Sequence, residues 1–293
     1  MYDKKISVIM GVYNQYDEEQ LHTAVKSILE QTETDFEFII YNDGSAKEVT
    51  ESIKKLASLD DRIIIIDAKE NKGLAFSLNM CIEKARGKYI ARMDADDMSY
   101  KDRFKEQIEF LENHPEYHWC GCNAVLFDEN GDWGERIMPE VPEGNDFLRY
   151  SPYIHPSVMY RRELFSEAGV YKVDDETLRC EDYEIFMRFH NSGYRGYNLQ
   201  KKLFGYRENR VSYNKRKIKY RINEGKIRYR NFKKMGLLTP KGWLYVARPL
   251  VGIIIPNNLL YKIKRRKDEK KQCVKESSVQ KDIGEGTDIL TSS

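Results

Sequence analysis

Short apolar runs alternate with helical stretches along the first 93 residues, and this alternation limits the possible folds more than any other feature of the sequence. The strand-like runs cover residues 5–13, 36–42, 62–67 and 88–93, and the helical stretches between them cover 18–30, 47–57 and 74–85. Such alternation predicts right-handed βαβ units, which build a mainly parallel sheet with helices on both faces. The third run, RIIIID, is almost continuously apolar, as expected for a strand buried on both faces. We therefore expect an α/β, Rossmann-like fold.

After residue 114 the alternation loosens into a less regular pattern. The expected elements are two strands joined by a turn at Asn130-Gly131 (119–138), a strand-like run (155–162), a helix ended by Gly193 (181–193) and a strongly basic helix (about 215–235). The final residues, 268–293, are polar and are predicted to be disordered.

The net charge of +2 conceals a strong asymmetry along the chain. Residues 1–200 hold 24 Lys/Arg and 39 Asp/Glu, a balance of −15, whereas residues 201–271 hold 23 and 4, a balance of +19. A basic C-terminal arm on an acidic body favours an anionic partner, either a membrane leaflet or a nucleic acid. Five cysteines without a C-x-x-C pair indicate free thiols in a reducing cytoplasm rather than a zinc site. The N-terminus runs directly into the first strand, so we expect no signal peptide.

Small, turn-forming or acidic residues follow each of the four predicted strands. They are Gly11-Val12-Tyr13-Asn14, Asn42-Asp43-Gly44-Ser45, Asn71-Lys72-Gly73 and Asp94-Ala95-Asp96-Asp97. Because ligands of open α/β sheets bind beyond the carboxyl ends of the strands, we expect these residues to share one binding edge.

The fourth strand end is the most informative because it places three carboxylates within four residues. Asp94, Asp96 and Asp97 repel one another unless a cation lies among them, and an Asp-x-Asp alternation can direct two carboxylates at one ion. Hard carboxylate oxygens suit Mg²⁺ or Mn²⁺, which bind through one or two carboxylates together with phosphate oxygens. The alternative is a solvated acidic turn that caps the next helix through Asp97 or Ser99.

Seven ordered motifs then resemble the family 2 glycosyltransferases, over residues 5 to about 213. The motifs are SVIMGVYN at 7–14, SILEQT at 27–32, YNDGS at 41–45, NKGLAFSLN at 71–79, GKYIARMDADD at 87–97, HPSVMYRR at 155–162 and CEDYE at 180–184. The resemblance is greatest to the bacterial branch that builds capsule, exopolysaccharide or O-antigen units on a lipid carrier. It implies a GT-A fold, with a catalytic domain at 1–213 made of a nucleotide-sugar half (1–114) and an acceptor half (115–213).

The resemblance implies a set of donor-binding residues. Tyr13 resembles the residue that packs on the nucleotide base, with Gly11 nearby, and Asp43 resembles the carboxylate that accepts a hydrogen bond from a uracil N–H. Asp94 would lie near the ribose and the metal, and Asp96 would be the direct Mn²⁺ or Mg²⁺ ligand at the diphosphate. The implied set is Gly11, Tyr13, Asn14, Asp43, Gly73, Asp94 and Asp96. The chain has Asn42 where many members have a second Asp, and a simple Asx turn is the alternative role for Asp43.

On the acceptor side, the resemblance makes Asp182 the general base that takes the proton of the attacking hydroxyl. One base without a nucleophilic partner carboxylate implies inversion of the anomeric configuration. Glu181 and His155 are assigned to the acceptor side. The alternative is that Glu181 and Asp182 only stabilise the N-terminus of a helix through its dipole. Lys72 and Arg92 could meet phosphate or lie on the surface.

The C-terminal arm, 214–267, is predicted to be a basic helical extension that lies on a membrane surface. The run Trp243 to Ile263 is apolar but is broken by Arg248, Pro249 and Pro256, so it is too short to span a bilayer and is typical of an interfacial helix. The basic residues Lys262, Lys264, Arg265, Arg266 and Lys267 follow it. The alternative is a helical pair packed on the catalytic domain. Nucleic-acid binding is not expected, because no module for it is visible and the acidic body would repel phosphates.

The sequence and the resemblance thus predict an inverting, metal-dependent glycosyltransferase that moves a sugar from a nucleotide diphosphate-sugar to an acceptor hydroxyl on a lipid-linked glycan. The role that the resemblance gives to Asp43 favours a UDP-sugar as the donor. The enzyme would be cytoplasmic and peripheral on the inner face of the cell membrane. A nucleotidyltransferase would need a Gly-rich loop after the first strand, where this chain has GVYNQY. A non-catalytic membrane-associated protein that merely kept the fold would be expected to lose Asp94, Asp96 and Asp182, all of which are present.

Overall fold

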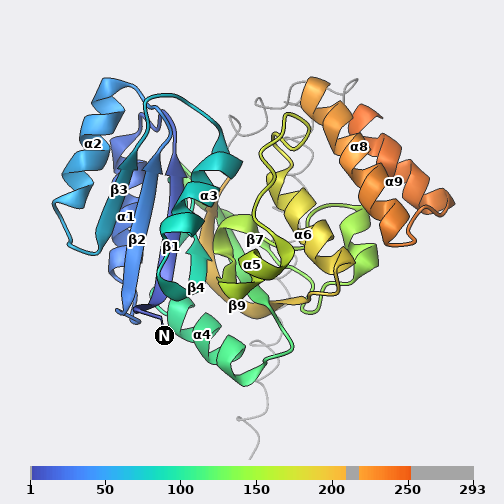
Figure 1. Ribbon diagram of the computed structural model, residues 1–293, viewed down its shortest axis with the longest axis horizontal. Coiled ribbons are helices and arrows are strands. Elements are labelled where there is room, and N and C mark those ends of the chain that lie inside the picture. The colour runs from blue at the N-terminus through green and yellow to red at the C-terminus, as the bar shows by residue number, and fades with distance from the viewer. Residues whose placement is uncertain (1, 209–217, 252–293) are drawn as a thin grey trace, which may run out of the picture.

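A computed structural model describes residues 2–208 and 218–251 of the chain (Figure 1). The strands are β1 (Lys4–Val12), β2 (Phe36–Asn42), β3 (Ile63–Asp67), β4 (Gly87–Arg92), β5 (Met98–Ser99), β6 (Trp119–Asp128), β7 (Gly131–Arg136), β8 (Met159–Arg161) and β9 (Gly196–Arg207). The helices are α1 (Glu18–Leu29), α2 (Lys47–Ala57), α3 (Leu74–Lys84), α4 (Arg103–Asn113), α5 (Glu163–Ala168), α6 (Glu181–Asn191), α8 (Ile218–Lys234) and α9 (Pro240–Val251), with 3₁₀ turns at Gly144–Leu148 and His155–Ser157.

The strands form one continuous sheet in the order β3-β2-β1-β4-β8-β6-β9-β5, with β7 paired to β6. Strands β3, β2, β1 and β4 are parallel, and β8 runs antiparallel between β4 and β6. The predicted α/β fold with a mainly parallel sheet is therefore confirmed, and the first four strands and three helices begin and end within a few residues of the predicted ones. The carboxyl ends of β1 to β4 meet at one edge, as expected.

Alternate side chains of the strands feed two separate cores, one on each face of the sheet. In β1, Ile6, Val8 and Met10 belong to one core, whereas Ile9 belongs to the other. Helices α1, α2 and α4 cover the first face, and α3, α5 and α6 cover the second. The period of two in a buried strand thus requires helices on both faces.

Two elements of the second half differ from the sequence prediction. Residues 155–162 are not one strand, because His155–Ser157 form a 3₁₀ turn and β8 begins only at Met159. Pro156 has no N–H to give to a ladder, and the Ser157 hydroxyl donates to the Ile154 carbonyl (2.8 Å), which closes the turn. The twelve-residue strand β9 was not predicted at all, because polar residues in its middle break the apolar alternation.

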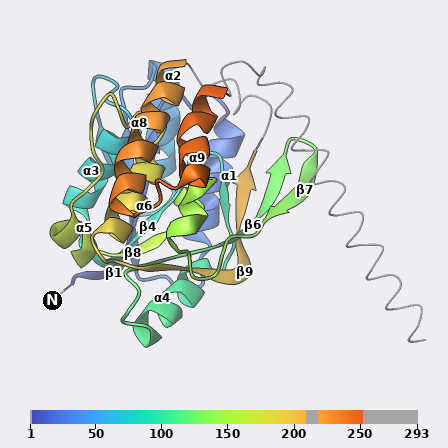
Figure 2. The ribbon, with the colours of Figure 1, turned by 90° about the vertical axis from the view of Figure 1, so that its right-hand side faces the viewer.

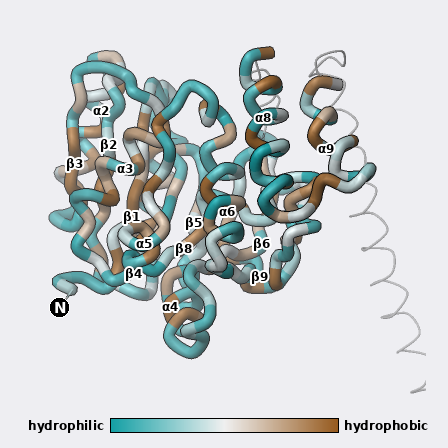
Figure 3. The backbone as a smooth tube through the Cα atoms, turned by 45° about the vertical axis from the view of Figure 1, so that its right-hand side comes forward, coloured by the Kyte–Doolittle hydropathy of each residue, from teal (hydrophilic) through white to brown (hydrophobic). Residues whose placement is uncertain are grey.

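Helices α8 and α9 pack on the body beside α6 (Figures 1 and 2). Ile227 and Phe232 of α8 are buried in the second core, and the buried Arg228 guanidinium donates to the Leu148 carbonyl (2.6 Å). Apolar and polar residues alternate along both helices (Figure 3). The described part of the extension is therefore a helical pair packed on the body, which was the alternative prediction. The basic cluster at 262–267, the tail at 268–293 and the boundary at 213 lie outside the described residues.

In the described parts of the chain, none of the helices has both the length and the apolar character needed to cross a membrane.

We expect Phe232→Ala to lower the free energy of unfolding by about 3 kcal/mol, because it empties a fully buried site between α8 and the second core. Urea unfolding followed by circular dichroism measures the change. Leu250→Ala is the matched control, because Leu250 on α9 is 44% exposed and should cost little. A loss below about 1 kcal/mol for Phe232→Ala would mean that α8 is not part of the folded core.

Candidate active site

The end of β1 approaches α3 closely and presents an aromatic ring to solvent. A Cβ on Gly11 would lie 3.0 Å from the Cβ of Ser77, so only glycine allows this approach without displacement. Asn14 has a positive φ of 48°, and its N–H donates to the Ser45 hydroxyl (3.0 Å), which ties the ends of β1 and β2 together. Tyr13, which lies between Gly11 and Asn14 in the sequence, is 53% exposed. The predicted base-packing residue is thus available to a ligand at this edge.

Asp43, at the end of β2, is buried and connects two strand-end loops. Its carboxylate accepts hydrogen bonds from the Asn71 side chain (2.7 Å) and from the backbone N–H groups of Lys72 and Gly73 (2.8 Å each). Gly73 has a φ of 91°, which favours glycine. The alternative role of Asp43 in a simple Asx turn is therefore wrong, since it is the Asn42 side chain that accepts the local turn bond. One Asp43 oxygen receives a single bond and retains capacity for another.

The carboxylates after β4 form the compact acidic cluster that the sequence predicted. Each of Asp94, Asp96 and Asp97 offers an oxygen within 4.8 Å of the others. Asp97 is buried, and one of its oxygens accepts from the Arg207 N–H (2.8 Å), while the other has no hydrogen-bond partner among the described residues. Burial, and then the charges of Asp96 and Asp94, raise the pKa of Asp97 well above its ordinary value. Such a cluster of oxygens suits a divalent cation.

The alternative of a helix-capping acidic turn does not describe this segment. Ser99 lies in β5, and α4 begins only at Arg103, preceded by Asp102. Neither Asp97 nor Ser99 is therefore a helix N-cap. The acidic turn instead lies between the sheet edge and β9, with the Arg207 side chain donating to the Asp96 carbonyl (2.9 Å).

Arg92 is the most important residue that the sequence analysis left undecided. It is 2% exposed, and its guanidinium holds both oxygens of Asp94 (2.6 and 3.0 Å). It therefore does not lie on the surface. The alternation of side chains along β4 could have predicted this position. Tyr89, Ala91 and Met93 belong to the first core, so Arg92 must face the other side of the sheet.

His155 is buried beside Tyr171 and does not lie on an exposed surface. Its side chain is buried, and Nε2 is 2.7 Å from the Tyr171 hydroxyl. Burial, and then the positive charge of Arg92, hold the pKa of His155 well below its usual range, so the imidazole is neutral. The contribution of His155 to the predicted acceptor site would therefore act through Tyr171.

Tyr171, which the sequence did not single out, connects the two predicted halves of the site. Burial raises the pKa of its hydroxyl to about 12, with Arg92 acting in the opposite direction and Asp182 and Asp94 adding to the rise. Its hydroxyl therefore senses the charges of both Asp94 and Asp182. The fold thus brings the predicted metal cluster and the predicted base to one neighbourhood.

Glu181 and Asp182 form the first turn of α6, where carboxylates are also favoured by the helix dipole. Burial raises the pKa of Glu181, and the negative charge of Asp182 adds to the rise. Glu184 in the same turn is buried and pairs with Lys172 (2.6 Å) and Arg188 (3.2 Å). Glu184 is thus fixed in a structural ion-pair network, whereas Glu181 faces a cleft.

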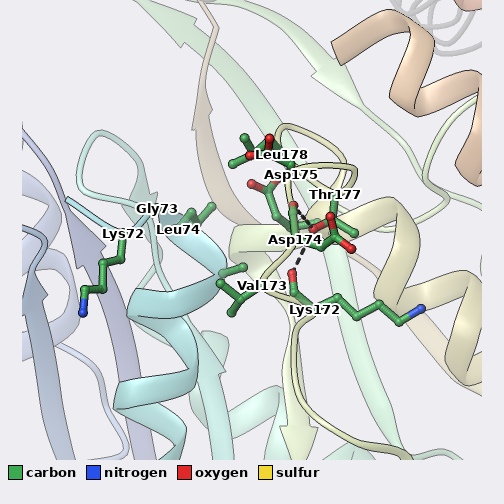
Figure 4. Close-up of a pocket in the computed structure, with 11 residues that line it drawn as sticks. Lys72, Gly73, Leu74, Lys172, Val173, Asp174, Asp175, Thr177 and Leu178 are labelled. Atoms are coloured by element: carbon green, nitrogen blue, oxygen red, sulfur yellow. Dashed lines mark hydrogen bonds between the residues drawn. The ribbon is translucent and has the colours of Figure 1, made fainter. Parts of the chain in front are cut away.

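That cleft has a volume of about 240 Å³ and separates the start of α3 from the loop before α6 (Figure 4). One wall is residues 72–75, and the other is formed by residues of 172–178 together with Glu181. Gly73 and Leu74 face Val173 and Asp174 across it, while the Lys72 side chain extends away along α3, with Nζ 5.0 Å from the Phe76 ring centroid. The 172–178 wall was not predicted, because its turn-rich sequence has no regular pattern.

Comparison with known proteins identifies relatives of this chain. The family model for glycosyl transferase family 2 matches residues 7–169. The chain is 36% identical over 274 residues to the putative glycosyltransferase EpsE of Bacillus subtilis (strain 168), covering 92% of this chain and 98% of that protein. It is 31% identical over 218 residues to the amylovoran biosynthesis glycosyltransferase AmsE of Erwinia amylovora, covering 72% and 79%.

Solved structures share the fold at low sequence identity. S. aureus TarS in complex with UDP superposes with a TM-score of 0.61 at 19% identity, covering 84% of this chain and 70% of that one. The mannosyltransferase PcManGT from Pyrobaculum calidifontis, in complex with GDP-Man and Mn²⁺, superposes with a TM-score of 0.61 at 16% identity, covering 93% and 85%. The sheet is thus of the GT-A type. From its ordered motifs, its fold and its relatives, the chain belongs to glycosyl transferase family 2 and is a glycosyltransferase.

Proposed function

We propose that the enzyme is an inverting, metal-dependent glycosyltransferase that moves a sugar from a UDP-sugar to a hydroxyl of a lipid-linked glycan, in the synthesis of a bacterial surface polysaccharide. The observation that carries the proposal is the acidic cluster of Asp94, Asp96 and Asp97 at the end of β4, and the charges of Asp94 and Asp182, which both raise the pKa of Tyr171, support a common site. The role of AmsE in amylovoran biosynthesis supports the polysaccharide pathway, and the TarS complexes with UDP and UDP-GlcNAc support the donor class.

Asp94 and Asp96 are the residues that would hold Mn²⁺ or Mg²⁺. The fit rests on three carboxylate oxygens within 4.8 Å and on the buried Asp97 oxygen without a hydrogen-bond partner in residues 2–208 and 218–251. A bound divalent ion supplies charge neutralisation for the departing diphosphate. Arg92 contributes by holding both Asp94 oxygens in place. The Mn²⁺ complex of PcManGT supports this assignment.

The nucleotide would bind at the ends of β1 and β2. The exposed Tyr13 ring offers a stacking surface for the base. The Asp43 oxygen that receives a single bond can accept another from a ring N–H of the base. Gly11, Asn14 and Gly73 shape the backbone around it. An acceptor carboxylate at this place suits a base with a ring N–H to donate, such as uracil, and disfavours cytosine and adenine, which have none.

Asp182 would act as the general base on the acceptor side. Its carboxylate takes the proton of the acceptor hydroxyl while the oxygen attacks the anomeric carbon from the face opposite the leaving diphosphate, which inverts the configuration. Glu181 lines the cleft and would bind acceptor hydroxyls. His155 would act through the Tyr171 hydroxyl.

Calorimetry with UDP-, GDP- and dTDP-sugars, each with Mn²⁺ and with a chelator, tests the proposed donor and metal. We expect binding of UDP-sugars that depends on the metal. Equal affinity in the presence of chelator, or a preference for a GDP-sugar, would overturn the corresponding part of the proposal.

We also propose that the enzyme is cytoplasmic and peripheral on the inner face of the membrane, held by its basic C-terminal extension. Residues 218–251 alone hold nine Lys/Arg against one Asp/Glu, and Trp243 and Leu244 of α9 are exposed. Basic residues beside exposed aromatic and aliphatic side chains are typical of attachment to anionic lipid.

We expect the full chain to sediment with phosphatidylglycerol–phosphatidylcholine vesicles, and less so as salt rises, because the attraction is screened over about 10 Å at 0.1 M salt. A chain cut after residue 251 keeps α8 and α9 but loses the basic cluster at 262–267, so it should sediment more weakly and still bind UDP-sugar. Pure phosphatidylcholine vesicles are the control. Equal sedimentation with both vesicle types would refute the electrostatic attachment.

A further inference from the structure

The loop of residues 172–178 lies between the cleft and α8 and leads directly into α6, which carries Asp182. The buried Thr177 hydroxyl bonds to the carbonyls of Lys172 and Asp174 (2.9 Å each), and the Cys180 N–H donates to the Thr177 carbonyl (2.8 Å). These bonds make the loop compact. They lie within the loop, however, so they do not fix its position relative to the rest of the protein.

The beginning of the loop is fixed on α3 by one amide side chain. Asn79 accepts from the Tyr171 N–H (3.0 Å) and donates to the Tyr171 carbonyl (2.8 Å). This pair of bonds connects the loop to the helix whose N-terminus forms the opposite wall of the cleft. The width of the cleft therefore depends on what holds the other side of the loop.

That other side is held by α8, a helix of the C-terminal extension. Asn223, which is 5% exposed, donates to the Asp175 carbonyl (2.7 Å). Lys219 pairs with the Asp175 carboxylate (2.7 Å), and Arg230 pairs with Glu176 (2.5 Å). Lys226 also pairs with Glu176 (3.6 Å), so one buried hydrogen bond and three ion pairs connect α8 to two consecutive loop residues.

We propose that α8 is a positioning element of the active site: through Asn223 and Arg230 it fixes the 172–178 wall of the cleft and, with it, the first turn of α6. The proposal rests on the proposed role of Asp182 in the same site. The C-terminal extension then has a part in turnover that is separate from any part in membrane attachment. The residues involved hold the loop and do not touch the substrate, so they are positioning residues and not catalytic ones.

The bonds from α8 are strong enough for their loss to be measured. Loss of an exposed ion pair changes a local opening equilibrium by up to about fivefold. Loss of the buried Asn223 bond should change it by about five- to tenfold. Amides of the loop that are protected by hydrogen bonds, such as those of Thr177 and Cys180, report this opening through hydrogen exchange.

Hydrogen-exchange mass spectrometry on the full-length protein tests the proposal. We expect Asn223→Ala and Arg230→Glu each to speed exchange of peptides covering 172–180 by about fivefold, with peptides covering 71–79 unchanged. Combining Glu176→Arg with Arg230→Glu restores an ion pair of reversed polarity and should return exchange part of the way to the wild-type rate, because Lys226, which also pairs with Glu176, then faces a like charge. Lys241→Glu is the control, because it makes the same charge reversal at an exposed position on α9.

Hydrolysis of UDP-N-acetylglucosamine, with water in place of the acceptor, gives a second readout. Asn223→Ala and Arg230→Glu should lower kcat with little change in the donor KM, and the Glu176→Arg/Arg230→Glu pair should raise kcat part of the way back. Unchanged loop exchange in both single variants would overturn the proposal, and so would faster exchange without a fall in kcat. If the wild-type protein does not hydrolyse this donor, UDP-N-acetylglucosamine is not a usable substrate, and the exchange rates alone decide whether α8 holds the loop.

Discussion

Replacing Asp96 with Asn is expected to reduce sugar transfer to background and to remove the metal-dependent part of UDP binding. The amide has nearly the same size as the carboxylate, so the backbone between β4 and β5 should keep its course. What is lost is the negative charge, and a neutral amide oxygen is a much poorer ligand for Mg²⁺ or Mn²⁺. Mutation of a residue that only orients a metal ligand lowers metal affinity by about 10–100-fold. Loss of a direct ligand should therefore lower metal affinity by at least about 100-fold.

Calorimetric titration of UDP with Mn²⁺ into wild-type and Asp96→Asn protein measures this effect. Asp61→Asn serves as the control, because Asp61 is exposed before β3, at the opposite edge of the sheet. Wild-type affinity of Asp96→Asn in the presence of Mn²⁺ would sink the metal assignment for Asp96.

Replacing Asp182 with Asn should leave donor and metal binding intact while turnover falls by about 10²–10⁴-fold, the range typical of a lost general base. Asn retains the shape of Asp and an acceptor oxygen, but it cannot take up the proton of the attacking hydroxyl. The first turn of α6 keeps Glu181 and Glu184, so the helix should remain stable without the third carboxylate. The two variants thus have opposite signatures: Asp96→Asn loses donor binding, and Asp182→Asn loses turnover alone.

Glu181→Gln separates the general base from its neighbour. If Asp182 is the base, Glu181→Gln should chiefly weaken acceptor binding, because Glu181 lines the cleft. Steady-state kinetics with saturating donor gives both parameters. Near-native turnover of Asp182→Asn together with a large loss in Glu181→Gln would transfer the catalytic role to Glu181 and leave Asp182 as a helix-stabilising residue.

The parallel half of the fold could be predicted from the sequence because its strands are buried on both faces. Strand β2 is buried along its whole length, and the helices between the strands keep a clear period. Strand β3 is the exception: its apolar run predicted burial on both faces, but it lies at the edge of the sheet and is mostly half-buried. Strand β9 could not be predicted in this way. Lys201 and Lys202 are exposed in its middle, so its hydrophobic pattern reads as two short pieces rather than one strand.

The candidate site likewise has one part that the sequence predicts and one part that it does not. The acidic cluster could be predicted because its three carboxylates are local in sequence and repel one another. The bonds that place them are not local: Tyr171 joins α3, the His155 turn and the neighbourhood of Asp182, and Asn223 holds a loop from a helix more than forty positions away. Nothing in the sequence near Tyr171 or Asn223 indicates these partners, because only the fold brings them together.

Anomalous diffraction from crystals grown with Mn²⁺ and a UDP-sugar tests most directly whether this edge of the sheet is a metal-dependent donor site. We expect one manganese peak within coordination distance of Asp96, near Asp94, with the diphosphate as a further ligand and the uracil between Tyr13 and Asp43. Diphosphate bound in this place with no manganese beside Asp96, or manganese bound only elsewhere on the protein, would contradict the proposed mechanism.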